Sequence, residues 1–193
     1  MTVRKTGNTK QKQHEFISQK QEQIQARQLA ALPHDPLKLQ AQDAVDLKVI
    51  SALLQDAIVP ATNFKYDSSD QTFTILANRF CWEESPERLN HRKIYGRIQC
   101  CLQFHHVHTV QHINIDRKDI KKHYNLLSID AINLEDVLIT FSDSSKLRLK
   151  ITELSCVIRD IDEMWYTTTV PKHDRSKNDG LFCVSSWGRN ESA

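Results

Sequence analysis

Four histidines stand within a short segment in the middle of the chain: His105, His106, His108 and His112. Alternate side chains of a β-strand share one face at a spacing of about 6.5–7 Å, so His106 and His108, with His112 farther along, are candidate metal ligands. A catalytic zinc site also needs a carboxylate or a third histidine fixed nearby, and none stands at a diagnostic spacing. We therefore expect a solvent-facing run without metal or cofactor, and keep a small metal-dependent hydrolase at His105–His112 as an alternative.

The cysteines are the next residues that could do chemistry, and there are five: Cys81, Cys100, Cys101, Cys156 and Cys183. No C-x-x-C pair occurs and no neighbouring residue marks a thiol as activated, so we expect buried thiols rather than nucleophiles. Cys100 and Cys101 are neighbours on a predicted strand, which predicts that one faces the core and the other does not. Phosphate-binding glycine loops, G-x-S-x-G and H-E-x-x-H are also absent. The sequence favours a protein that is not an enzyme but leaves that question open.

Basic residues gather in two segments, each with a tyrosine: Arg88, Arg92, Lys93 and Arg97, then Arg117, Lys118, Lys121 and Lys122. Such clusters could contact phosphate groups or another anionic ligand, but acidic residues in the same segments favour a mixed, solvated surface. Arg79 differs because it stands within an otherwise apolar strand, where it either pairs with a carboxylate or reaches into a functional groove. The candidate ligand or partner contacts are Arg79, Arg92, Lys93 and Arg97.

The formal net charge of +2 is unevenly distributed along the chain. Residues 1–38 contain seven basic and three acidic groups, and residues 171–193 contain four basic and three acidic groups. Residues 39–170 contain 15 basic and 18 acidic groups, so this middle segment is net negative. A domain that binds a phosphate backbone normally has a surplus of lysine and arginine, and the middle segment lacks one. An RNA- or nucleotide-associated function would therefore use the basic N-terminal arm.

Two prolines, Pro33 and Pro36, mark the start of the folded part because they disfavour helix before and across them. We expect a Gln/Lys-rich flexible arm at residues 1–36, a single globular domain at 37–170 and a flexible tail at 171–193. No apolar run is long enough to span a membrane, and no signal peptide is recognisable. These features, with the odd number of cysteines, predict a cytoplasmic protein.

The globular segment begins with a predicted strand at 37–41 and a helix capped by Asp43. The expected buried positions of this helix are Val45, Val49, Ile50, Leu53, Leu54 and Ala57. A β-hairpin follows at about 64–75, and a change of apolar parity predicts a bulge near Ala77-Asn78 and a buried Trp82.

The rest of the segment is predicted to be mostly strands. Residues 83–96 are polar and indicate an exposed loop, and residues 97–115 indicate one long bent strand or two short ones. Strands are expected at 126–134, 137–141 and 146–151, and the spacing of Leu154, Val157, Ile158 and Ile161 predicts a closing helix.

These elements predict an α+β fold: an antiparallel β-rich domain of five to seven strands with one N-terminal and one C-terminal helix. Its sheet is expected to be strongly bent or a small barrel, pleckstrin-homology-like by analogy, and such an analogy implies no function.

Two segments carry a family resemblance, Leu37–Val59 and Leu76–Glu83, with shorter matches such as Leu102-Gln103-Phe104 and Leu147-Arg148-Leu149. Over about residues 37–166 the chain resembles a family of small bacterial proteins known as domain of unknown function 2948. The resemblance implies these domain limits and a bacterial cytoplasm, and supplies no activity, cofactor or site residue. We therefore expect a non-enzymatic interaction or regulatory module with an unknown protein partner, with RNA binding through the arm as the alternative.

Overall fold

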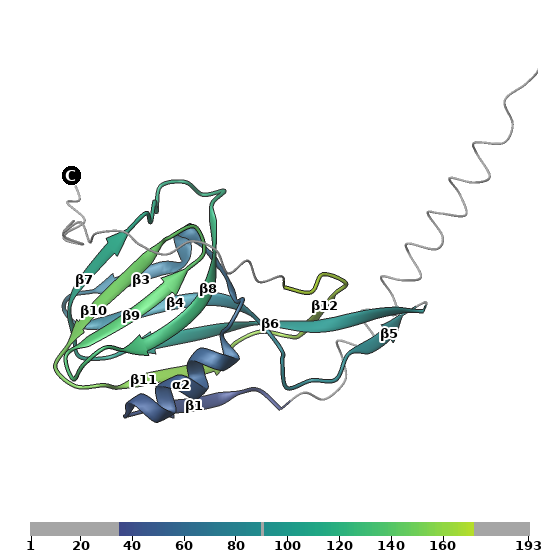
Figure 1. Cartoon of the computed structure of the whole chain (residues 1–193), viewed down its shortest axis with the longest axis horizontal. Helices are drawn as coiled ribbons and strands as arrows, with labels where there is room; N and C mark the ends of the chain where they lie inside the picture. The colour runs from purple at the N-terminus through teal and green to yellow at the C-terminus, as the bar shows by residue number, and fades with distance from the viewer. Residues whose placement is uncertain (1–34, 90, 172–193) are drawn as a thin grey trace, which may run out of the picture.

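The computed structural model describes residues 35–89 and 91–171, and antiparallel β-structure makes up most of this part (Figure 1). In chain order its elements are β1 (Lys38–Ala41), α2 (Ala44–Leu53), β2 (Ile58–Pro60), the 3-10 turn η1 (Ala61–Asn63), β3 (Phe64–Asp67), β4 (Thr72–Phe80), β5 (Glu87–Leu89), β6 (Arg92–Phe104), β7 (Val107–Ile113), β8 (His123–Ala131), β9 (Asp136–Phe141), β10 (Lys146–Ile151), β11 (Cys156–Asp160) and β12 (Trp165–Thr167). The predicted arm and tail lie outside the described residues, apart from their edges at 35–36 and 171. No helix of the described part is long and apolar enough to span a membrane.

The strands pair in the order β1-β11-β6-β4-β2-β8-β9-β10-β7, with β3 beside β4, and β5 and β12 beside β6. All of these pairings are antiparallel, as the short connections predict. The two ends of the path, β1 and β7, are not joined by a ladder, and the sheet is neither closed nor strongly curled. The expectation of a strongly bent sheet or small barrel is therefore wrong, and so is the count of five to seven strands.

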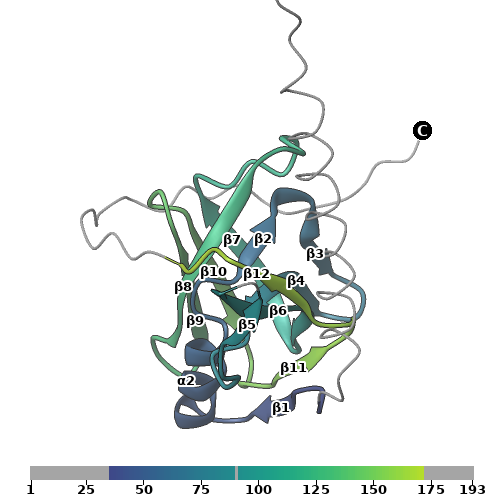
Figure 2. The ribbon, with the colours of Figure 1, turned by 90° about the vertical axis from the view of Figure 1, so that its right-hand side faces the viewer.

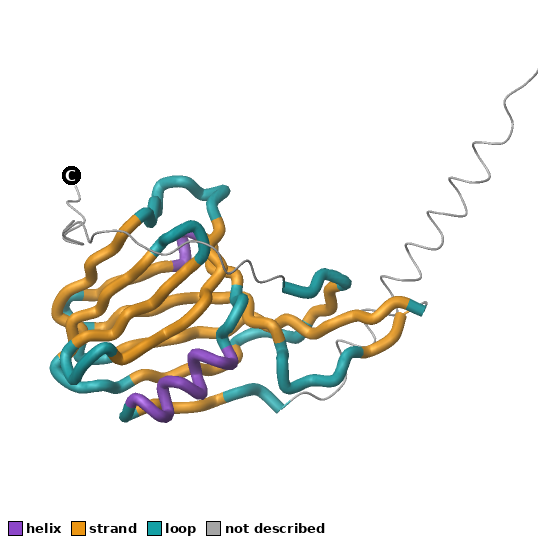
Figure 3. Tube along the Cα trace, viewed as in Figure 1, coloured by secondary structure: helices purple, strands orange, loops and turns teal. Residues whose placement is uncertain are grey.

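The helix α2 begins where the sequence predicts, because Asp43 Oδ1 accepts hydrogen bonds of 2.8 Å from the backbone N–H groups of Val45 and Asp46. Ile50 is buried as predicted, but so is Leu47, which was not predicted, whereas Val45 and Val49 are 72% and 52% exposed. The helix lies along the strands (Figure 3), where Ser51 Oγ accepts a 2.8 Å hydrogen bond from the N–H of Ile129 on β8. The helix is confirmed, but the face predicted to be buried is partly wrong.

One large core joins the inward-facing side chains of the helix and most strands. At its centre the rings of Phe64, Tyr124 and Phe141 meet in tilted and edge-on contacts, with centroids 5.7 to 5.9 Å apart. This core joins the strands of the sheet and the helix in one packed unit.

Two elements differ from prediction for a shared reason. The ladder between β4 and β6 runs without a break from Phe73 to Phe80, so the predicted bulge is absent. The segment predicted as a closing helix contains strand β11, which pairs with both β1 and β6. In each strand a charged residue occupies an inward position, Arg79 in β4 and Asp160 in β11, and this breaks the apolar alternation on which strand prediction depends.

A three-stranded ribbon replaces the loop predicted at 83–96. The first half of β6 extends beyond the sheet with β5 on one edge and β12 on the other, and it projects to one side in Figure 1 and toward the viewer in Figure 2. Cys81, Ile98 and Met164 form a small buried cluster at its base. Position 96 favours glycine, because a Cβ at this position would lie 2.6 Å from Met164 Sδ.

Candidate functional site

The pairing of β6 gathers aromatic and basic side chains on one face of the ribbon. Directly opposed residues of an antiparallel pair share a face, as do alternate residues of one strand. Arg97 lies opposite Phe80 on one side and Trp165 on the other, and Arg88 lies opposite Lys93. We call this surface the aromatic–basic face, and define it as Phe80, Trp82, Arg88, Lys93, Tyr95, Arg97 and Trp165.

The rings of this face are held in place by contacts with one another and with the backbone. The centroid of Phe80 lies 4.4 Å from that of Trp82 and 5.6 Å from that of Tyr95, and the Arg97 guanidinium carbon lies 5.3 Å from the Phe80 centroid. Trp82 Nε1 donates a 3.0 Å hydrogen bond to the carbonyl of Gln55, just after α2. The face is therefore fixed to the main body of the domain.

Two tryptophans of the face remain open to solvent. Trp82 is 42% exposed and Trp165 is 37% exposed, whereas Phe80, which contacts the Trp82 ring, is buried. The prediction that Trp82 is buried is wrong, because this residue follows the end of β4 and its ring lies over Phe80 instead of entering the core.

Arg97 is a positioning residue of the face. Its side chain is largely buried, and its Nη1 donates a 3.2 Å hydrogen bond to the carbonyl of Asn78. Burial lowers the pKa of Arg97, while the neighbouring Asp56 opposes this effect. Arginine stays protonated in proteins, so a fixed cation lies against the aromatic rings.

The acidic residue of the β5–β6 ladder, Glu87, lies on the face opposite Arg88 and Lys93. Glu87 lies opposite Ile94 and therefore on the side of Gly96 and Tyr166. Burial raises the pKa of Tyr166, and the negative charges of Glu87 and Glu84 raise it further. In the structure Glu87 is therefore separated from Arg88 and Lys93, while Arg92 shares the face of Glu87.

The four residues predicted to contact a ligand or partner do not lie on one surface. Lys93 and Arg97 lie on the aromatic–basic face, while Arg92 lies opposite Leu89 on the other side of the ribbon. Arg79 is 0% exposed and pairs with Asp160, so of its two predicted roles the structure shows the ion pair. Sequence analysis missed Trp165, which a long-range pairing brings to Arg97.

The histidine run does not form the shared face on which the alternative of a metal site depends. His106 lies in the turn between β6 and β7, with a φ of 57° and its Nε2 3.0 Å from Glu153 Oε1. His108 Nε2 lies 3.4 Å from Thr152 Oγ1, and the pKa of His112 is lowered by burial and then by Arg117. Among residues 35–89 and 91–171, no three histidine, cysteine, aspartate or glutamate side chains meet as metal ligands.

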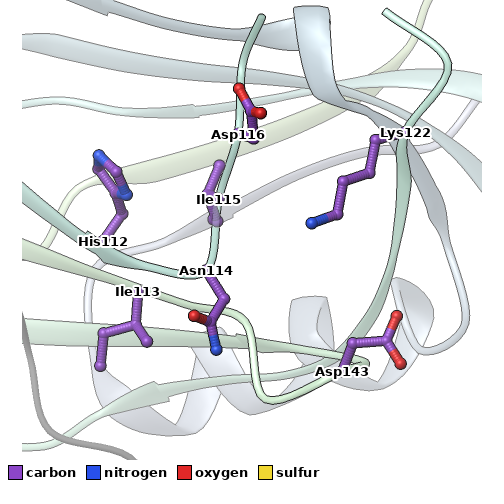
Figure 4. Close-up of a pocket in the computed structure, with 7 residues that line it drawn as sticks. All are labelled: His112, Ile113, Asn114, Ile115, Asp116, Lys122 and Asp143. Atoms are coloured by element: carbon purple, nitrogen blue, oxygen red, sulfur yellow. The ribbon is translucent and has the colours of Figure 1, made fainter. Parts of the chain in front are cut away.

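A cavity of about 490 Å³ opens at the end of β7 (Figure 4). It is lined by His112, Ile113, Asn114, Ile115, Asp116, Lys122 and Asp143. Lys122 extends across it, with its ammonium 5.1 Å from the ring centroid of Tyr124. The lining charges have both signs, so the cavity favours no ligand charge.

The described cysteines are free and unsuited to nucleophilic chemistry. Burial raises the pKa of Cys81 and of Cys100 to about 12, and raises that of Cys156 further. Cys100 is buried while its neighbour Cys101 is partly exposed, which confirms the predicted opposite faces. Cys183 lies outside the described residues.

The fold and the site together define an antiparallel β-sheet domain with a projecting ribbon that carries the aromatic–basic face. The chain belongs to the family described as protein of unknown function (DUF2948), whose model matches residues 37–173. This confirms the resemblance seen in the sequence. No curated protein and no solved structure matches the chain.

Proposed function

We propose that this protein is a non-enzymatic interaction or regulatory module that binds a protein partner through the aromatic–basic face. The observation that carries the proposal is the pair of exposed tryptophans, Trp165 on the projecting ribbon and Trp82 between β4 and the ribbon. Tryptophan, tyrosine and arginine are the residues that most often dominate the binding energy of protein interfaces.

The fixed geometry of the face also supports the proposal. The hydrogen bond from Trp82 to Gln55 and the stacking of Arg97 on Phe80 order these side chains before any partner arrives. Binding then requires less loss of side-chain entropy, which improves affinity for a given contact area.

The residues that could do chemistry support a binding role over catalysis. The described thiols have raised pKa values, and the histidines of the central run have separate neighbours. Free cysteines are typical of a reducing compartment, so the proposal includes a cytoplasmic location.

Site-specific photocrosslinking in cells tests the proposal. A photoreactive phenylalanine analogue replaces Tyr95 on the face or, as a control, the 90% exposed Leu134 far along the chain. We expect a discrete protein adduct from position 95, lost when Trp82→Ala and Trp165→Ala are added, and no such adduct from position 134. Identical adducts from both positions, or an adduct that persists without the two tryptophans, would contradict the proposal.

A second candidate function, RNA or nucleotide association through residues 1–36, rests on the positive charge of residues 1–38. Electrostatic binding predicts an affinity for single-stranded RNA that falls steeply with salt. Replacing the arm's lysines by glutamine in the full chain separates the two functions, because the photocrosslink at position 95 would survive while RNA binding would be lost.

A further inference from the structure

We infer that the partner presents an acidic segment whose carboxylates bind between Arg88 and Lys93 while its apolar side chains contact the neighbouring aromatic rings. The inference rests on the proposed function, and it specifies the chemistry of the partner at the same face.

The first observation is a pair of like charges in direct opposition. Arg88 on β5 and Lys93 on β6 are register partners, and both are exposed. Like charges opposed across a ladder are destabilising. Among the described residues neither side chain forms an ion pair with a carboxylate. An anionic group bound between them would relieve this repulsion, so the site is suited to a carboxylate from outside.

The second observation is the position of the ribbon's own carboxylates. Glu87 lies on the opposite face, because it pairs with Ile94 in the β5–β6 ladder. Glu83 is engaged with Arg79, at 2.7 Å between Oε1 and Nη2. The nearby acidic side chains therefore leave Arg88 and Lys93 available.

The third observation is the alternation of side chains along β6. Lys93, Tyr95 and Arg97 follow one another on this face at a spacing of about 6.5–7 Å. Arg97 is largely buried against Phe80. The exposed groups on this face, from the tip of the ribbon to its base, are therefore two cations followed by aromatic rings. An extended peptide with acidic residues beside apolar ones matches this order.

The charge of the whole domain favours an acidic peptide over a nucleic acid. Residues 39–170 contain more acidic than basic groups, whereas binding to a phosphate chain depends on neutralising many phosphates at once. Two accessible cations suit a few carboxylates held beside apolar side chains.

A selection from random peptides of about 12 residues by the full-length protein tests the inference. We expect the selected peptides to be enriched in aspartate and glutamate next to aromatic or aliphatic residues. Arg88→Glu combined with Lys93→Glu should reduce the affinity for the selected peptides at least about tenfold. The matched control is Arg92→Glu, which changes a charge on the opposite face of the same ribbon and should change affinity less than about twofold.

A single variant separates binding from folding. Arg88→Glu replaces the like-charge pair with an opposite-charge pair, so the thermal midpoint should stay the same or rise while peptide affinity falls. A fall in both would show that Arg88 acts through stability and would overturn the inference.

The remaining outcomes are also decisive. Selected peptides that lack acidic enrichment yet depend on Trp82 would overturn the acidic partner and leave the proposed function standing. Selection of no peptide would overturn both. Tight binding of oligouridylate that requires Lys93 but not Arg92 would overturn both in favour of a nucleic-acid surface.

Discussion

Arg79 and Asp160 meet inside the sheet, across strand β6, with both side chains removed from solvent. Arg79 Nε and Nη2 donate hydrogen bonds of 2.8 Å to the two carboxylate oxygens of Asp160. Asp160 Oδ2 also accepts a 2.8 Å hydrogen bond from the N–H of Leu37. Burial lowers the pKa of Arg79, but the bonds to Asp160 and Glu83 raise it by more, so the pair is charged when folded. The pair therefore ties β4, β11 and the start of β1 together.

Replacing Arg79 by methionine should reduce the free energy of unfolding by about 3–5 kcal/mol, because it leaves the carboxylate of Asp160 buried without its cation. Urea unfolding measures the loss. Arg159→Met is the matched control, since this neighbouring arginine on β11 is exposed, and it should change stability by less than about 1 kcal/mol. Equal losses in the two variants would show that the buried pair has no special contribution.

Asp136 makes stability depend on pH. Its carboxylate accepts hydrogen bonds from Arg148 at 2.7 and 2.9 Å and from Asn133 at 3.0 Å. Its pKa is lowered to about 2, with the Arg148 bonds as the largest cause. A depressed folded-state pKa contributes stability above the ordinary value near 3.8, and this stability is lost as the pH falls toward the folded pKa.

Between about pH 5 and pH 2 we expect the wild-type protein to lose roughly 2 kcal/mol more stability than Asp136→Asn, which cannot titrate at this position. Urea unfolding at several pH values measures the difference. Parallel pH profiles for the two proteins would exclude this role of Asp136.

At the scale of elements, local patterns predicted the parts whose inward positions are all apolar. The strand at the start of the domain, the helix capped by Asp43, the β3–β4 hairpin and strands β8 to β10 appear close to their predicted places. The bulge predicted in β4 and the helix predicted over β11 are both wrong near a buried charged residue, Arg79 or Asp160. Each residue by itself reads as a polar position that should face solvent. Only the pairing of the strands in the fold shows that the two charges neutralise each other.

The candidate site was predicted only in part, for a related reason. The cluster containing Lys93 and Arg97 is visible in the sequence, but the face that they share is created by pairings. Trp165 reaches Arg97 through the β6–β12 ladder, and the separation of Arg92 from Lys93 depends on the β5–β6 register. Neither follows from a pattern within one segment.

Gly96 tests how the ribbon is attached to the sheet. A methyl group at this position would lie 2.6 Å from Met164 Sδ and 3.4 Å from Cys81 Cβ, so Met164 must move. We expect Gly96→Ala to reduce the free energy of unfolding by about 1–2 kcal/mol through overpacking. Combining it with Met164→Ala should cost less than the sum of the two single variants, as a double-mutant cycle by urea unfolding would show. Strict additivity would mean that the two residues do not share this space.

At the scale of the whole molecule, one extensive core supports a small projecting unit. The main core includes side chains from α2 and most strands, whereas the ribbon's base is held by the cluster of Cys81, Ile98 and Met164. A domain built in this way can keep its stability in the sheet while the ribbon's exposed residues serve the proposed binding. This division explains why the aromatic–basic face can carry two exposed tryptophans without weakening the core.

The first strand sets the N-terminal limit of this unit. Strand β1 pairs with β11 from Lys38 to Ala41, and the backbone of Leu37 accepts a 2.9 Å hydrogen bond from the N–H of Asp160. Ala41 is fully buried and Leu39 packs against the core. The folded unit therefore needs β1, and the family match also begins at residue 37.

A chain that begins at Leu37 should unfold cooperatively, with a free energy of unfolding within about 1 kcal/mol of the full-length value. A chain that begins at Gln42 lacks β1, so the edge of β11 is exposed. It also lacks the hydrogen bond from the N–H of Leu37 to the buried carboxylate of Asp160. The lost burial of Leu39 and Ala41, together with the lost ladder, should reduce stability by more than about 3 kcal/mol. Urea unfolding of the two truncated chains beside the full-length protein makes the comparison. Equal stability of the two truncations would show that β1 is dispensable, and a large loss on removing residues 1–36 alone would place part of that segment inside the folded unit.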